Sequence, residues 1–158
     1  MTDIQTITSY ISDIPDPEIP VITIKELGIL RDVKWVEDTV MVTITPTYTG
    51  CPAMGLIEAQ IKENLAAKGI HKVKVDLTYT PAWTTDWMSE EAKEKLRKYG
   101  IAPPVHSSCF KSFNTLPVAC PRCRSSHTRL ISQFGSTACK ALYQCEDCKE
   151  PFDHFKCH

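Results

Sequence analysis

CPRCRSSHTRLISQFGSTACKALYQCEDC, residues 120–148, is the stretch that decides the fold of the C-terminal part of this chain. It opens and closes on Cys-x-x-Cys pairs, formed by Cys120 with Cys123 and by Cys145 with Cys148. Each pair places two thiolates on a tight turn, where both can bind one ion at about 2.3 Å in a tetrahedral site. The 21 residues between the pairs slightly exceed the usual ribbon spacing, but they suit a hairpin that turns near Gly135. We therefore predict a β zinc ribbon with these four cysteines as metal ligands.

Zinc in this ribbon is expected to be structural. A segment of this size cannot bury enough apolar surface to fold alone, and a bound metal supplies the missing free energy. This favours structural zinc over a redox iron-sulfur centre. Four further potential ligands lie outside the two pairs: Cys139, Cys157, His154 and His158. They form either a second metal site or ordinary small polar or buried positions, and their lack of paired spacing favours the second interpretation.

Composition excludes several classes of partner. The chain has 158 residues and a formal net charge of -1, so no global field would hold it on nucleic acid or on an anionic membrane. Arginines near the first cysteine pair raise a nucleic-acid-binding ribbon as an alternative, which the near-zero charge disfavours. No apolar run approaches the roughly 18 residues of a membrane span, and the N-terminus lacks signal-peptide features. We expect a cytoplasmic protein, and in a reducing cytosol the eight cysteines indicate metal binding and not disulfides.

The first hundred residues predict an α+β fold, a small sheet covered by helices. Isoleucines at spacings of three and four indicate a helix over 3–14, and alternating or periodic apolar residues predict the later elements. These are strands at 29–36, 40–45 and 71–80 and helices at 52–68 and 90–99. We assign residues 1–100 to this domain, 101–118 to a linker that is rich in Pro and Ser, and 119–158 to the ribbon.

Cys51 stands between the end of a predicted strand and the start of a predicted helix. A helix N-terminus stabilises a thiolate, so Cys51 suits a nucleophile or a transient metal ligand, or else it is a buried cysteine at a helix start. Asp16 and Glu18 lie among three prolines and are either further ligands, a partner-binding acidic corner, or solvated turn residues. Trp83 and Trp87 form either a contact surface or an anchor in the core.

These motifs resemble a known combination of domains. Asp16-Pro17-Glu18, Leu27-Gly28 and Thr49-Gly50-Cys51-Pro52 are similar to those of SufT-related iron-sulfur assembly domains. With the ribbon motifs at 134–140 and 150–152, the whole chain resembles the PaaD family, which is encoded with the bacterial phenylacetyl-CoA epoxidase. The resemblance implies an accessory factor for the maturation of that enzyme's di-iron oxygenase or iron-sulfur reductase subunits. It also implies that Cys51 is the functional thiol, with Asp16 and Glu18 near it, and that the ribbon cysteines bind metal.

Our leading hypothesis is a maturation factor that briefly holds iron or an iron-sulfur cluster at Cys51, shared across a homodimer or with a client. A second hypothesis is an enzyme that uses Cys51 for thiol exchange or acyl transfer, which needs a general base such as His71 or His106. A third is a ribbon protein that only docks on the oxygenase complex. The chain has no pair of Glu-x-x-His motifs and no Gly-rich dinucleotide fingerprint, so we expect it not to be the catalyst itself.

Overall fold

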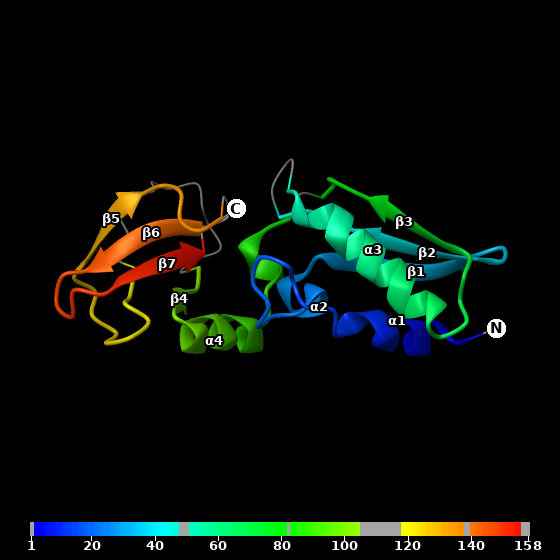
Figure 1. Cartoon of the computed structure of the whole chain (residues 1–158), viewed down its shortest axis with the longest axis horizontal. Coiled ribbons are helices and arrows are strands. Elements are labelled where there is room, and N and C mark those ends of the chain that lie inside the picture. Colours follow the sequence, from blue (N-terminus) through cyan, green and yellow to red (C-terminus); the bar gives the residue numbers. More distant parts are fainter. Residues whose placement is uncertain (1, 48–50, 82, 105–117, 138–139, 156–158) are drawn as a thin grey trace. The chain divides into compact units, whose positions relative to one another are not determined.

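A computed structural model describes residues 2–47, 51–81, 83–104, 118–137 and 140–155. The chain divides into two compact units, Met1–Trp83 and Thr84–His158 (Figure 1). Among the described residues, no helix is both long and apolar enough to cross a membrane. The domain boundaries expected at residues 100 and 119 remain predictions, and 105–117, most of the predicted linker, lies outside the described residues.

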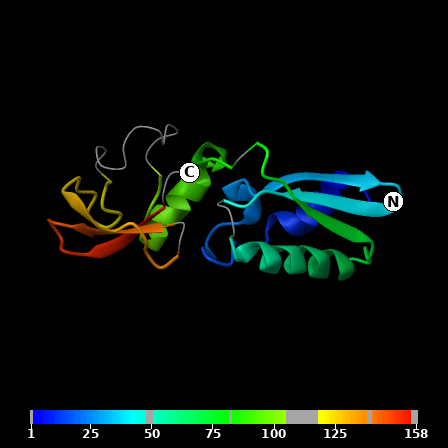
Figure 2. The ribbon, with the colours of Figure 1, turned by 90° about the horizontal axis from the view of Figure 1, so that it is seen from above.

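A three-stranded sheet forms the centre of the first unit. Its strands, in spatial order, are β1 (Leu30–Val36), β2 (Thr39–Ile44) and β3 (Val73–Leu77). β1 and β2 are antiparallel, whereas β2 and β3 are parallel and are joined through helix α3 (Ala53–Ala66). A parallel pair needs such a crossover. As a result, the start of α3 and the loop after β3 lie at the same end of the sheet, the carboxyl end of β2 and β3 (Figures 1 and 2).

Helices α1 (Ile4–Ser12) and α3 contact each other and cover one face of this sheet (Figure 2). The predicted apolar positions supply the core, because Ile7 and Ile11 of α1 and Val40 and Val42 of β2 are buried. Three apolar residues of α3, spaced four apart within the helix predicted at 52–68, are fully buried: Ile57, Ile61 and Leu65. The predicted α+β fold of a small sheet covered by helices is therefore confirmed.

A short helix that the periodicity did not predict, α2 (Ile24–Leu27), precedes β1. Thr23 and Glu26 form a reciprocal capping box at its start, and Gly28 ends it in the left-handed conformation at φ 85°. The Trp83 indole Nε1 donates to the Leu27 carbonyl oxygen at 2.9 Å, and Trp83 is buried. Of the two alternatives for this tryptophan, the structure supports the anchor in the core.

In its described residues, the second unit contains a four-stranded sheet and one α-helix. α4 (Glu90–Tyr99) follows a short 3-10 turn, η1 (Thr85–Trp87), and matches the helix predicted at 90–99, with Ser89 as its N-cap and Gly100 as its C-cap. The spatial order of the strands is β4 (Ile101–Ala102), β7 (Pro151–Phe155), β6 (Lys140–Cys145) and β5 (Thr128–Ser132). The predicted hairpin is β5 paired antiparallel with β6. β4 and β7, which pair in parallel, were not predicted.

A hydrogen bond from His154 on β7 holds β4 at the edge of this sheet. The His154 ring Nδ1 donates to the Ala102 carbonyl oxygen at 3.1 Å, and the ring meets Tyr143 edge-on. The residue is buried, and burial lowers the pKa of His154 to about 4. This burial supports the interpretation of His154 as an ordinary buried residue; Cys139, Cys157 and His158 lie outside the described residues.

The buried neutral His154 should make stability fall as pH falls. In the unfolded chain this imidazole takes a proton near pH 6.5, but in the folded chain it does so only near pH 4. The unfolded state therefore binds more protons between these values, and the linkage relation gives a loss of about 1.3 kcal/mol between pH 7.5 and 5.5. Urea unfolding with saturating zinc at both pH values measures this loss. His154→Asn has no titrating ring, so its free energy of unfolding should fall by about 1.3 kcal/mol less than that of wild type over this pH range. Equal losses in the two proteins would contradict a buried, neutral His154.

Candidate functional site

The structure brings the four predicted ribbon cysteines together. Their sulfur atoms all lie within 4.8 Å of one another, with Cys120 Sγ 3.7 Å from Cys148 Sγ and Cys123 Sγ 3.5 Å from Cys145 Sγ. Zn–S bonds of about 2.3 Å in a tetrahedron separate the sulfurs by about 3.8 Å. The donor set and its spacing therefore fit a single zinc ion. Among the described residues, this is the one cluster of at least three side chains that could hold a metal.

Two loops, here called knuckles, carry these sulfurs: residues 120–123 and 145–148. Cys120 and Cys145 are buried, whereas Cys123 is exposed. Hydrogen bonds from the backbone N–H groups of Cys148 and Asp147 lower the pKa of Cys145 to about 7. The Ser125 backbone lowers the pKa of Cys123, but the neighbouring thiols, that of Cys145 first, outweigh it and raise that pKa to about 12. The cluster therefore retains protons at neutral pH that an incoming metal must displace.

Polar side chains that the sequence analysis did not single out connect the two knuckles. Ser125 Oγ donates to Asp147 Oδ2, and His127 Nδ1 lies 3.3 Å from Asp147 Oδ1. The Ser125 hydroxyl and then the His127 ring hold the pKa of Asp147 below its usual value. These residues are not part of a periodic pattern. The one sequence signal for them is their position: Ser125 and His127 follow Cys123 by two and four residues, and Asp147 lies between Cys145 and Cys148.

Cys51 lies at the carboxyl end of β2 and β3, directly before α3. It is half-buried, and its carbonyl oxygen accepts a hydrogen bond from Met54 N at 3.4 Å in the first turn of the helix. The N-cap residue Pro52 provides no side-chain hydrogen bond to this turn. Thr49 and Gly50, the first two residues of the Thr-Gly-Cys-Pro motif, lie outside the described residues.

Asp16 closes the turn that leads into α2. It is buried, and its Oδ1 accepts hydrogen bonds from Glu18 N at 2.8 Å and Ile19 N at 2.9 Å. The expectation of a solvated turn is therefore wrong for Asp16, because its carboxylate replaces water as the acceptor for these N–H groups. Glu18 is half-buried. A role for either carboxylate beside Cys51 remains a prediction.

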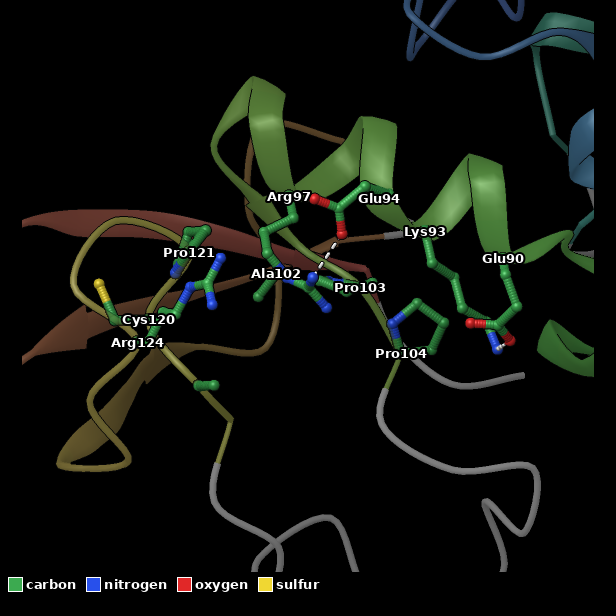
Figure 3. A pocket seen from close by; sticks show the side chains of 11 residues that line it. Glu90, Lys93, Glu94, Arg97, Ala102, Pro103, Pro104, Cys120, Pro121 and Arg124 are labelled. Carbon is green, nitrogen blue, oxygen red and sulfur yellow. Dashed lines mark hydrogen bonds and ion pairs between the residues drawn. The ribbon is translucent and has the colours of Figure 1, made fainter.

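A cavity of about 660 Å³ lies between α4 and the first knuckle of the second unit. Figure 3 shows Arg97, from α4, and Arg124, which directly follows the first knuckle, on facing sides of it. On α4, Lys93 pairs with Glu90 at 3.2 Å and Arg97 pairs with Glu94. The remaining lining residues are Ala102, Pro103, Pro104, Ala119, Cys120 and Pro121. The cavity is lined by charges of both signs that are largely paired with each other, so its lining does not indicate a particular ligand.

Comparison with protein families divides the chain into two matches. Residues 4–77 match the model described as iron-sulfur cluster assembly protein. Residues 104–156 match the PaaD zinc beta ribbon domain. The combination of an iron-sulfur assembly domain with this ribbon agrees with the resemblance inferred from the sequence motifs.

Relatives and solved structures agree with this division. A protein from Escherichia coli strain K12, provisionally described as one of the subunits of 1,2-phenylacetyl-CoA epoxidase, is 52% identical over 98% of this chain and 93% of its own length. An Fe-S protein maturation auxiliary factor from Porphyromonas gingivalis is 38% identical over 58% of this chain and 89% of its own length. The crystal structure of a DUF59 domain from Bacillus anthracis, 28% identical, covers 59% of this chain and 90% of its own, with a TM-score of 0.54.

Loss of one buried ribbon thiol should abolish stable zinc binding. Cys145→Ser is expected to reduce bound zinc from about one ion per chain to a small fraction, because a tetrahedral site loses a ligand and a serine hydroxyl does not replace a thiolate. Elemental analysis after dialysis against a weak chelator measures the zinc content. Cys51→Ser is the matched control and should keep its zinc; equal zinc loss in both variants would contradict the assignment of the ligands.

Proposed function

This chain belongs to the PaaD family of 1,2-phenylacetyl-CoA epoxidase proteins, and from that membership we propose that it is an accessory factor for maturation of the epoxidase. Its cargo is iron or an iron-sulfur cluster, which Cys51 binds transiently and passes to an oxygenase or reductase component of the enzyme. The four ribbon cysteines hold a resident structural zinc. The protein acts in the cytoplasm as a helper and not as the catalyst.

The position of Cys51 is the observation that carries this proposal. The thiol precedes the first turn of α3, where backbone N–H groups point toward the helix N-terminus and no side chain of Pro52 caps them. The positive end of a helix dipole stabilises a thiolate, which is the form that binds metal. Because Cys51 is half-buried, an incoming partner can reach it. The ends of parallel strands are also where α/β sheets commonly bind ligands.

The two proposed metal sites, the ribbon and Cys51, differ in the number of ligands that the chain supplies. The ribbon offers four sulfurs to one ion, which closes a tetrahedral site. Cys51, by contrast, is the one cysteine described in the first unit, and the described residues around it form no metal-ligating cluster. A cargo bound there therefore keeps coordination positions for ligands from a client or a second copy of the chain. This incomplete ligation is what transfer requires, since the client's ligands can replace Cys51 one at a time.

The alternative of acyl transfer through Cys51 lacks a positioned base. His71 follows the C-terminal end of α3, whereas Cys51 precedes its N-terminal end. A helix of 14 residues separates the two by about 20 Å. The other candidate, His106, lies outside the described residues. A covalent acyl adduct on Cys51 after incubation with an acyl-CoA thioester, detected by mass spectrometry, would favour this alternative.

We predict that Cys51→Ser abolishes maturation but leaves the fold intact. The epoxidase subunits are produced with the wild-type chain, with Cys51→Ser or with no such chain, and the iron content and activity of the purified epoxidase are measured. The variant should resemble the preparation without the chain, because the serine hydroxyl is not ionised near neutral pH. Leu56→Ser, at an exposed site in the first turn of α3, is the control and should support maturation. Full maturation by Cys51→Ser would reject Cys51 as the cargo ligand and leave docking through the ribbon as the function.

A further inference from the structure

The two knuckles of the ribbon are separated by 21 residues of the chain, so contacts between them must keep their sulfurs at the separation that one metal ion needs. β5 begins just after the first knuckle, and its first residue, Thr128, pairs with Cys145 at the end of β6. This pairing aligns the knuckles, and the backbone bond from Glu146 N to the His127 carbonyl oxygen extends it to the second residue of the second knuckle. Asp147 and Cys148 lie beyond the pairing of β5 with β6, in the turn that joins β6 to β7.

Three side chains bridge this remaining gap. Asp147 lies between the two ligands of the second knuckle and accepts hydrogen bonds from the Ser125 hydroxyl and the His127 ring. The ring and the carboxylate also form an ion pair at 3.2 Å when His127 is protonated. Ser125 is in turn fixed, because its Oγ accepts a hydrogen bond from His127 N at 3.0 Å.

Backbone hydrogen bonds anchor both sides of the bridge to the cysteines. The Ser125 carbonyl oxygen accepts from Cys120 N at 2.9 Å, so the serine is attached to the first ligand of its knuckle. On the other side, Glu146 N donates to the His127 carbonyl oxygen at 2.7 Å. A movement of Asp147 away from Ser125 would therefore also move Cys145 and Cys148 away from Cys120 and Cys123.

We propose that Ser125, His127 and Asp147 form a clasp that keeps the two knuckles together and thereby slows release of the ribbon's metal. Asp147 is the positioning residue: it touches no metal, but it holds the loop that carries two of the ligands. Side chains that orient metal ligands in this way typically change metal affinity by about 10- to 100-fold when they are removed. The clasp thus makes the ribbon a site that retains zinc, which goes beyond the cargo role proposed for Cys51.

The charge of Asp147 and its role as a clasp predict opposite effects of its removal on zinc binding. Zinc with four thiolates carries a net charge of about -2, so a nearby carboxylate repels the filled site. If Asp147 acted only through its charge, its removal would strengthen zinc binding. If it acts as a clasp, its removal weakens binding. Glu146 lies in the same loop and offers a matched control, since its carboxylate has no hydrogen bond or ion pair among the described residues.

The test is the rate at which the zinc-loaded, full-length chain transfers its ion to a chromophoric chelator. Asp147→Ala should release zinc about 10- to 100-fold faster than wild type, and Ser125→Ala should also be faster. The double variant should be no faster than Asp147→Ala, because both single changes break the same bridge. Glu146→Gln, which removes one negative charge from the same loop, should release zinc at the wild-type rate or more slowly.

Two further measurements keep the proposal falsifiable. The absorption spectrum of the cobalt-substituted protein reports whether each variant still forms the tetrahedral four-sulfur site. Asp147→Asn, which keeps the size and one acceptor oxygen, should release zinc at a rate between those of wild type and Asp147→Ala. Release from Asp147→Ala at the rate of Glu146→Gln, with an intact cobalt spectrum, would overturn the clasp. That result would leave the role of Cys51 untouched, because the maturation assay does not depend on the zinc release rate.

Discussion

The need to hold four thiol sulfurs within 4.8 Å is the constraint on which the second unit depends. Four thiolates at this distance would repel one another, and two of the sulfurs are buried, so the fully ionised cluster needs a cation. A zinc ion bound to the four sulfurs would meet this need and would connect two loops that are far apart in sequence. The small apolar cluster beside it, which includes Val118 and Phe152, is too small to supply that stability alone.

In the proposed function, the thiol group serves two purposes in this chain because its surroundings differ. In the ribbon, four sulfurs, backbone N–H groups and the bridge through Asp147 surround one position, an arrangement that favours slow exchange of a bound ion. At the start of α3, Cys51 has the helix N-terminus nearby and is partly accessible. A closed site suits a structural metal, whereas an open thiol suits a cargo that must leave. The proposed maturation role uses this difference.

Local sequence patterns predicted most of the first unit and the ligand set. The helices with buried Ile7, Ile11, Ile57 and Leu65 follow from apolar periodicity, and the cysteine pairs define the metal cluster without any knowledge of the fold. The pairing of β4 with β7 could not be predicted, because β4 is only two residues long. The bond from Trp83 to Leu27 and the bridge through Asp147 are long-range contacts of single side chains, and such contacts leave no periodic trace.

X-ray absorption at the zinc and iron edges of one anaerobically reconstituted sample tests the central claim, a division between resident zinc and iron cargo. We expect the zinc edge to show four sulfur ligands at about 2.3 Å, both in wild type and in Cys51→Ala. The iron edge should show sulfur ligation in wild type that is lost in Cys51→Ala. Iron with four sulfur ligands that are unaffected by Cys51→Ala would place the iron in the ribbon and contradict the account.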